Sequence, residues 1–291
     1  MPHGLDHIVH VIRDLDAAGE CYRRAGFTVG ARNRHPWGTH NRIVQFAGVF
    51  IELLAVSEPE LIVAGAPGSF SFGGFARDFL THDEGLAMLV LEGRGAAADA
   101  ERFRAAGIGD FDVFDFERQA KRPDGSTVRV AFSLAFAADA KAPDIGYFTC
   151  QQHFPENFWN PAFQLHPNGV SGIAGVIMVS ARPEDQRHFL EAFSGVSETR
   201  SSACGISVQT ARGDIQVMNP SAYRAYAGTE PPNLTRGPRL AAIRFVAGDK
   251  AEVMSALKKG DIAAAERNGN IVVPPDVAHG ATLIFETSKA G

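Results

Sequence analysis

The chain contains the same short unit four times. In each copy an apolar strand leads through a short helical segment to a glycine, and the copies run from Leu5 to Gly26, Leu86 to Gly107, Ile173 to Gly195 and Leu240 to Gly260. The spacings are 21, 21, 22 and 20 residues. Each glycine is followed by polar, strand-like sequence and then by another apolar run. An internal period of this kind constrains the architecture before any single motif does. It predicts a strand, a helix and several further strands, built four times over.

The first copy shows the predicted order in detail. Leu5 to Ile12 is rich in β-branched residues, which favours a strand. Leu15 to Ala25 places apolar residues on one helical face, and Gly26 is expected to end this helix in the left-handed conformation. Further strands are predicted at residues 27–35, 42–46 and 49–56. The order is therefore βαβββ, and the fold class is α+β with four such modules.

Composition narrows the class of protein. The 291 residues are enough for two domains, and we place the boundary at Asn168-Gly169, giving domains 1–168 and 169–291. The net charge is −5 without a basic cluster, which excludes a nucleic-acid partner. No apolar stretch is long enough to span a membrane. The three cysteines have no metal-ligand spacing, and no signal peptide precedes the first strand, so a cytoplasmic location is predicted.

Three longer connections interrupt the repeat. Residues 58–83 are rich in Gly, Phe and Ser and are expected to form a cover or a mobile loop. Residues 153–169 carry several aromatic residues and are expected to pack against the protein. Residues 221–238 are polar and proline-rich, and a surface loop is predicted there.

Two polar side chains stand on apolar strand faces. The two-residue period of a strand places His7 on one face with Leu5, Val9 and Val11, and places Glu52 with Phe50 and Leu54. A carboxylate on such a face costs several kcal/mol unless it is paired or coordinates an ion. Either a functional site or an ion pair with Arg32, Arg34 or Arg42 satisfies this requirement. His10 falls on the opposite face, toward the helix, and is interpreted as structural.

The modules, the Leu5-Asp6-His7 start and the lone Glu52 together resemble the vicinal oxygen chelate superfamily, which includes glyoxalase I, extradiol dioxygenases and bleomycin resistance proteins. The segments 37–41, 50–54 and 166–169 resemble a glyoxalase-like branch of it. The resemblance implies that two modules pair into a cupped mixed sheet, giving two glyoxalase-like domains. It also implies that the cup holds a divalent metal between its first and fourth strands, with His7 and Glu52 as ligands.

The second module departs from the pattern of the superfamily. Met88 stands where a His or Gln ligand is expected, and residues 145–150 contain no carboxylate. His153, at the end of that strand, is the best replacement. A His7, Glu52 and His153 set would suit Zn²⁺, Fe²⁺ or Mn²⁺. Gly175 stands at the position of His7 in module three, and Ala242 or Ile243 stands there in module four. The site is therefore expected in the N-terminal pair, and the C-terminal pair is expected to be structural.

Two functions remain open from the sequence. The first is a metal-dependent lyase or isomerase of the glyoxalase type, with Glu52 as a ligand or as the catalytic base. The second is a metal-free small-molecule binding or resistance protein that uses the same cup. In both, Trp37, His40 and Trp159 are candidates for binding the substrate. His40 and His153 are also compatible with plain roles in a turn and a linker. A homodimer is left open as the assembly.

Overall fold

The computed structural model describes residues 2–121 and 125–287, which form two eight-stranded sheets and several short helices. The strands of the first sheet are β1 Leu5–Val11, β2 Asn33–Arg34, β3 Thr39–Phe46, β4 Val49–Val56, β5 Gly85–Glu92, β6 Phe114–Lys121, β7 Thr127–Ala137 and β8 Gly146–Gln152. Those of the second are β9 Val170–Val179, β10 Thr199–Ser202, β11 Gly205–Gln209, β12 Asp214–Met218, β13 Arg239–Ala247, β14 Ala265–Arg267, β15 Asn270–Val273 and β16 Thr282–Thr287.

The helices are short and fall into two groups. Each module has one helix after its first strand, and these are α1 Leu15–Arg24, α3 Ala96–Ala105, α5 Arg187–Ser194 and α7 Lys250–Lys259. The other group lies in the connections between modules and consists of α2 Phe72–Leu80, α4 Pro155–Phe158 and α6 Pro220–Ala227. The predicted order βαβββ is therefore confirmed in all four modules.

The strand order shows how the modules pair. It is β2-β3-β4-β1-β5-β8-β7-β6 in the first sheet and β10-β11-β12-β9-β13-β16-β15-β14 in the second. Within a module the first strand runs parallel to the fourth, and the first strands of paired modules are antiparallel. The sheets are therefore mixed, as predicted, and each consists of two modules joined through their first strands.

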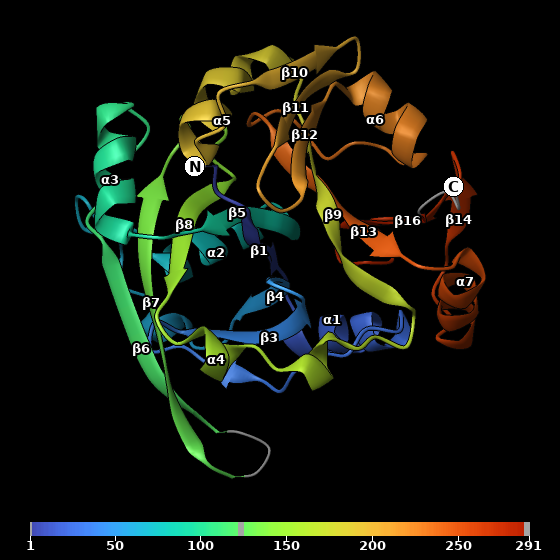
Figure 1. Cartoon of the computed structure of the whole chain (residues 1–291), viewed down its shortest axis with the longest axis horizontal. Coiled ribbons are helices and arrows are strands. Elements are labelled where there is room, and N and C mark those ends of the chain that lie inside the picture. Colours follow the sequence, from blue (N-terminus) through green and yellow to red (C-terminus); the bar gives the residue numbers. More distant parts are fainter. Residues whose placement is uncertain (1, 122–124, 288–291) are drawn as a thin grey trace.

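Glycines end three of the module helices in the left-handed conformation, at Gly26, Gly107 and Gly195. The fourth differs from the prediction, because Gly260 has φ −83° and Asp261 takes the positive φ instead. Gly260 is required for another reason. A Cβ atom there would lie 1.8 Å from the carbonyl oxygen of Arg24, so the absence of a side chain lets α7 approach α1 (Figure 1).

One hydrophobic core runs through both halves of the chain. It contains the helix-covered faces of the two sheets. Phe27 lies 5.0 Å from Phe245 and 6.0 Å from Phe285 between ring centroids, although the predicted domain boundary separates them. The two sheets therefore exclude water from a common interior.

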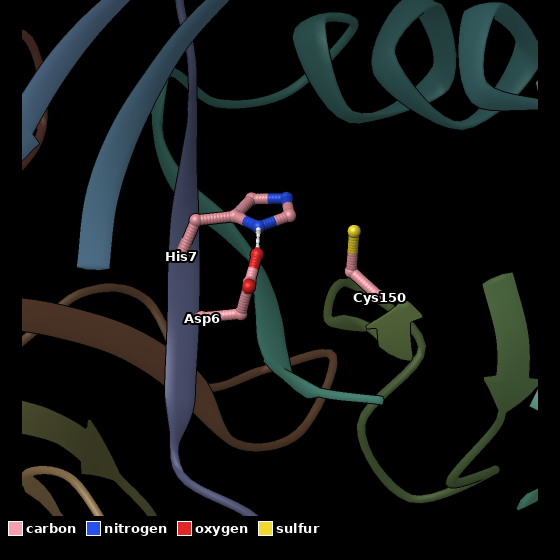
Figure 2. A group of neighbouring side chains, drawn as sticks. All are labelled: Asp6, His7 and Cys150. Atoms are coloured by element: carbon pink, nitrogen blue, oxygen red, sulfur yellow. Dashed lines mark hydrogen bonds and ion pairs between the residues drawn. The ribbon is translucent and has the colours of Figure 1, made fainter. Parts of the chain in front are cut away.

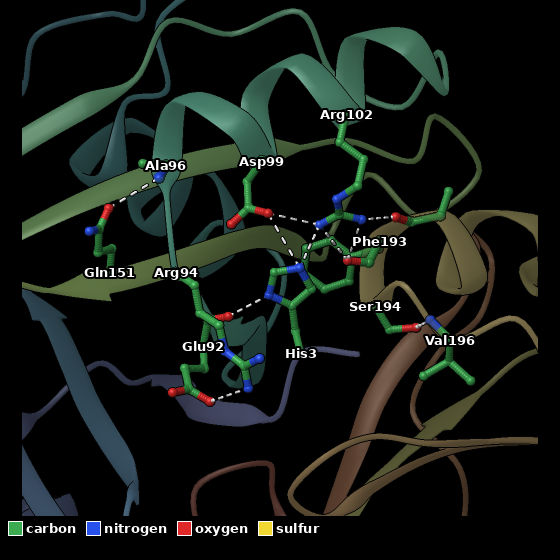
Figure 3. A network of polar contacts seen from close by, with 11 residues as sticks. His3, Glu92, Arg94, Ala96, Asp99, Arg102, Gln151, Phe193, Ser194 and Val196 are labelled. Atoms are coloured by element: carbon green, nitrogen blue, oxygen red, sulfur yellow. Dashed lines mark hydrogen bonds and ion pairs between the residues drawn. The ribbon is translucent and has the colours of Figure 1, made fainter. Parts of the chain in front are cut away.

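A polar network joins the N-terminal segment, α3 and the end of α5 (Figure 3). The imidazole of His3 lies 2.6 Å from the carbonyl oxygen of Glu92 and 3.3 Å from a carboxylate oxygen of Asp99. Arg102 donates to Asp99 and to the carbonyl groups of Ala192 and Phe193. Those carbonyls belong to the last turn of α5, where a cation is favourable. The network thus adds hydrogen bonds and ion pairs to the apolar packing that connects the N-terminal and C-terminal halves of the chain.

The cup of the second sheet is filled by its own chain. The surface loop predicted at residues 221–238 is wrong for its first part, because α6 begins at Pro220 and ends at Ala227, with Asn219 capping its N-terminus through the amide of Ala222. Residues 228–238 do form a loop. Tyr223 and Ala227 are buried against Ile177 and its neighbours on this sheet. Beside them, Arg244 forms ion pairs with Asp214 and Glu286. Apolar packing and a charge network therefore occupy the space where a ligand would enter.

His10 is structural, as predicted. Its Nε2 donates to the carbonyl oxygen of His279 at 2.7 Å, and its Nδ1 accepts from the hydroxyl of Tyr22 at 3.0 Å. The neutral imidazole is therefore fully hydrogen-bonded, and burial lowers the pKa of His10 from 6.5 to about 4.

We expect acid to destabilise the protein through His10. The unfolded chain takes up a proton near pH 6.5 and the folded chain only near pH 4, so the unfolded state binds more protons between these values. This stability is present above pH 6.5 and lost as the pH falls to about 4, and it amounts to ~3 kcal/mol. Urea unfolding at a series of pH values, compared with His10→Gln, measures it. An equal pH slope in the two proteins would contradict the assignment.

Within the described residues, no helix is both long and apolar enough to cross a membrane.

Candidate functional site

The cup of the first sheet contains a cavity of about 100 Å³. Eight of its seventeen lining residues are Phe or Trp, so its wall is mainly aromatic. The polar side chains on this wall come from five different strands and from the segment before β3. They are His7, His35, Asn41, Glu52, Arg118 and Cys150.

A bulge in β1 determines how His7 is presented. In the pairing of β1 with β5, Leu5 faces Leu91 and His7 faces Val90, so Asp6 is an extra residue. A bulge of this kind turns two successive side chains toward one side of the sheet. Val9 and Val11 share the face of His7 as predicted, whereas Leu5 packs in the core on the opposite face.

Asp6 fixes the orientation of the His7 ring. Its Oδ1 accepts from Nδ1 of His7 at 2.5 Å, and its Oδ2 accepts from Gln152 at 3.1 Å. Figure 2 shows both side chains leaving β1 on the side of Cys150. Stacking on Phe50, with ring centroids 4.3 Å apart, holds the ring flat against the wall. Because Nδ1 carries the proton that Asp6 accepts, Nε2 is the nitrogen with a free lone pair.

Glu52 lies next to His7 on the adjacent parallel strand. Val9 faces Glu52 in the register of β1 with β4, so His7 and Glu52 are diagonal neighbours. Nε2 of His7 is 3.9 Å from Oε2 of Glu52. Asn41 donates to the other oxygen, Oε1, at 2.6 Å, and Nε2 of His35 lies 4.0 Å from the same oxygen. The carboxylate is therefore held by an amide and flanked by two imidazoles.

Aromatic contacts connect the turn after β2 with β6, and these two strands form the edges of the first sheet. Trp37 stacks on His35 with centroids 4.7 Å apart, and it meets Phe116 of β6 at 4.9 Å and Phe114 at 5.6 Å. The indole Nε1 of Trp37 is buried and has no hydrogen-bond partner among the described residues. Burial also lowers the pKa of His35, which favours its neutral form.

The distance between His7 and Glu52 allows both side chains to bind one divalent ion. Metal bonds to N and O donors are about 2.0–2.2 Å long, so two ligands of one ion lie no more than about 4.4 Å apart. The 3.9 Å between Nε2 of His7 and Oε2 of Glu52 meets this limit. The 2.5 Å between His7 and Asp6 is a hydrogen-bond distance, so Asp6 orients the imidazole, as outer carboxylates do for metal-bound histidines.

Cys150 is a third candidate donor. Ligand atoms of Asp6, His7 and Cys150 all lie within 4.8 Å of one another, the one such group found among the described residues. Burial raises the pKa of the Cys150 thiol well above its usual value. An ion bound there must therefore displace a proton from the sulfur.

Of the six predicted site residues, the structure brings three to this cavity, namely His7, Glu52 and Trp37. Trp159 lies one layer out, with its ring 5.9 Å from that of Phe50, while its neighbour Phe158 lines the wall. His40 is buried on the other face of β3, with Nε2 3.6 Å from a carboxylate oxygen of Glu58.

His153 is not brought to His7 and Glu52 in the described structure. Its Nε2 lies 2.7 Å from the hydroxyl of Ser133. Ser133 alternates along β7 with Phe132 and Leu134, which line the cavity, so it projects from the opposite face. His153 belongs there to a separate surface hollow with Asp115 and Arg129. The predicted three-residue set is therefore not assembled, because the side chain at the strand end points away from the cup.

The alternative ion pair for Glu52 is not formed either. Arg32 and Arg42 pair with Asp16, and Arg34 pairs with Glu58.

Sequence reasoning missed Asp6, His35, Asn41, Arg118 and Cys150. The pattern Phe114, Phe116, Arg118 has the period of a strand face, and this period is the signal in the sequence that indicates Arg118.

Comparisons with known proteins agree with this fold. The sequence model of a family described as glyoxalase-like domain matches residues 5–193. Comparison with curated proteins finds no significant match. Among solved structures, a hypothetical protein from Staphylococcus aureus has a TM-score of 0.67 at 14% identity, covering 98% of this chain and 100% of its own.

Two further structures share the fold at low sequence identity. A variant of 4-hydroxymandelate synthase from Streptomyces coelicolor has a TM-score of 0.58 at 11% identity, covering 100% of this chain and 94% of its own. A fusion of a xylose isomerase-like TIM barrel with 4-hydroxyphenylpyruvate dioxygenase has a TM-score of 0.53 at 13% identity, with 100% of this chain and 49% of that one covered.

Paired βαβββ modules around a cup are the fold that the chain shares with these solved structures. The chain belongs to the glyoxalase-like domain family, whose sequence model covers most of its length.

Proposed function

We propose that the N-terminal cup is the active site of a metal-dependent enzyme of the glyoxalase type, a lyase or isomerase acting on a small oxygenated substrate. The single observation that carries this proposal is the pair His7 and Glu52, whose donor atoms lie 3.9 Å apart on an apolar wall. Zn²⁺, Fe²⁺ and Mn²⁺ all suit imidazole and carboxylate donors. When bound, such an ion acts as a Lewis acid that polarises oxygen atoms of the substrate.

The residues of the chain would divide the remaining work. Asp6 holds the His7 ring in one tautomer, and Asn41 holds one oxygen of Glu52. Glu52 is also the group best placed to accept a proton from a substrate in the cavity. The aromatic wall excludes water, which strengthens each electrostatic contact within it.

The runner-up is a metal-free binding protein on the same cup. In the second module, the strand register places Met88 and Phe148 at the positions that correspond to His7 and Glu52. The second module therefore supplies no imidazole or carboxylate ligand at these positions, which favours the binding protein. His7 and Glu52 alone are fewer than the three protein ligands usual for catalytic zinc. Metal content distinguishes the two functions.

Glu52→Gln tests the proposal. The wild-type protein, purified without chelators, is expected to contain one equivalent of divalent metal by elemental analysis. The variant should bind that metal about a hundredfold more weakly. Losing a residue that only hydrogen-bonds to a metal ligand already weakens metal binding 10–100-fold, and in this proposal Glu52 is itself a ligand. Urea unfolding should show an intact fold in the variant.

The matched control is Glu58→Gln. Glu58 is also a carboxylate beside a histidine, His40, but it lies outside the cavity lining. The control should keep its metal. Wild-type protein that binds none of the three metals on titration would refute the enzyme proposal and favour the binding protein.

The free state of Cys21, Cys150 and Cys204 supports a cytoplasmic location as part of this proposal. We keep a homodimer as an open assembly.

A further inference from the structure

Arg118 is a cation on the cavity wall. It lies on β6 and follows Phe114 and Phe116 on the strand face that lines the cup. Across the described residues, no hydrogen-bond or ion-pair partner lies within reach of its guanidinium. The other arginines near this cup are paired, including Arg42 with Asp16 and Arg129 with Glu117.

The charge of Arg118 persists despite its burial. Burial lowers its pKa, and the field of Glu52 opposes that change. A guanidinium stays protonated in proteins even so. Glu52 does not neutralise it by direct contact, because one Glu52 oxygen is already bonded to Asn41 and the other faces His7. A half-buried guanidinium against aromatic rings is costly unless something else pairs with it.

Trp37 and His35 line the same cavity as Arg118. Trp37 stacks on His35, and the positive charge of Arg118 acts on His35 as well. Phe116, two residues before Arg118 on β6, contacts both rings. Arg118 therefore brings an unpaired positive charge to the aromatic part of the cavity wall.

We propose that the substrate is a small apolar monoanion and that Arg118 binds its carboxylate. The apolar body of the substrate lies against the aromatic wall. The planar fork of the guanidinium matches a carboxylate in two parallel hydrogen bonds. The aromatic lining provides the complementary surface for a ring or short hydrocarbon. The proposal rests on the cup being the functional site and names the substrate class. It needs no metal ion.

The test compares carboxylates with their uncharged amides. Phenylacetate, benzoate and phenylpropionate, each with the matching amide, are titrated by calorimetry into wild-type protein, both as purified and after treatment with a chelator. At least one acid should bind 10–100-fold more tightly than its amide in both states, the range expected for hydrogen bonds to a charged group. In Arg118→Gln the preference should vanish.

Arg129→Gln is the matched control. Arg129 lies on the neighbouring strand β7 but is paired with Glu117 and lines the separate hollow, not the cavity. It should keep the full preference. Equal binding of all three acids and amides by wild-type protein, or a preference that survives Arg118→Gln, would overturn the inference.

The outcome is independent of the metal experiment. A carboxylate preference that depends on Arg118 in a protein that binds no metal leaves the inference standing and refutes the enzyme proposal. Stoichiometric metal with no carboxylate preference refutes the inference about Arg118 and leaves the enzyme proposal standing.

Discussion

Replacing Arg244 with methionine is expected to lower the free energy of unfolding by about 3–5 kcal/mol, the range for breaking a buried ion pair from one side. The Arg244 side chain is only 9% exposed and bonds to Asp214 at 2.6 Å and Glu286 at 2.7 Å. Without the guanidinium, two half-buried carboxylates face each other without a cation. Urea unfolding at neutral pH measures the loss.

Acid should partly rescue the Arg244→Met variant. Burial raises the pKa of Asp214 even with Arg244 present. A group with a raised folded pKa contributes stability that is present below its unfolded pKa and lost as the pH rises through the folded one. Removing Arg244 enlarges this shift, so the deficit should shrink as the pH falls toward 4. Arg224→Met, which removes an exposed pair with Glu230, should cost about 0–1 kcal/mol at all pH values. A deficit independent of pH would contradict the mechanism.

The same network explains why the two cups differ. In the first sheet the wall carries His7, and the connection containing α2 leaves a cavity. In the second, Gly175 stands at the corresponding position, and the carboxylate of Asp214 occupies the space a Cβ atom would need. Tyr226 of α6 donates to Glu286 of this network. Helix and charges together close the cup.

The fold could be predicted because its signals are local and repeated. A strand followed by a glycine-terminated helix is readable in each copy, and four copies reinforce one another. The helix α6 was missed because the polarity of residues 221–238 indicates a loop. Asn219 and Pro220, directly before them, are a capping residue followed by proline, which also starts helices. Tyr223 is buried by strands that are distant from it in the sequence, so the polarity of the neighbouring residues does not indicate this burial.

The site residues could be predicted only where the two-residue alternation along a strand is unbroken, because the alternation then gives the face on which each side chain lies. His7 and Glu52 follow from alternation along β1 and β4. Asp6 could not be found in this way, because a bulge breaks the alternation and depends on pairing with β5. His153 was misplaced because its face is set by the register of β8 with β7, which the sequence does not state.

Replacing Phe245 with alanine is expected to cost about 3–5 kcal/mol, the range for a large aromatic in a core. Phe245 is fully buried and touches the rings of Phe27 and Phe46 across the two sheets. Both tryptophans lie before residue 169, so their fluorescence reports the N-terminal half alone. If the core is shared, this C-terminal substitution shifts the fluorescence and far-ultraviolet transitions in urea together. The exposed Phe163→Ala should shift neither by much. An unchanged fluorescence transition would instead mean that 1–168 and 169–291 unfold independently.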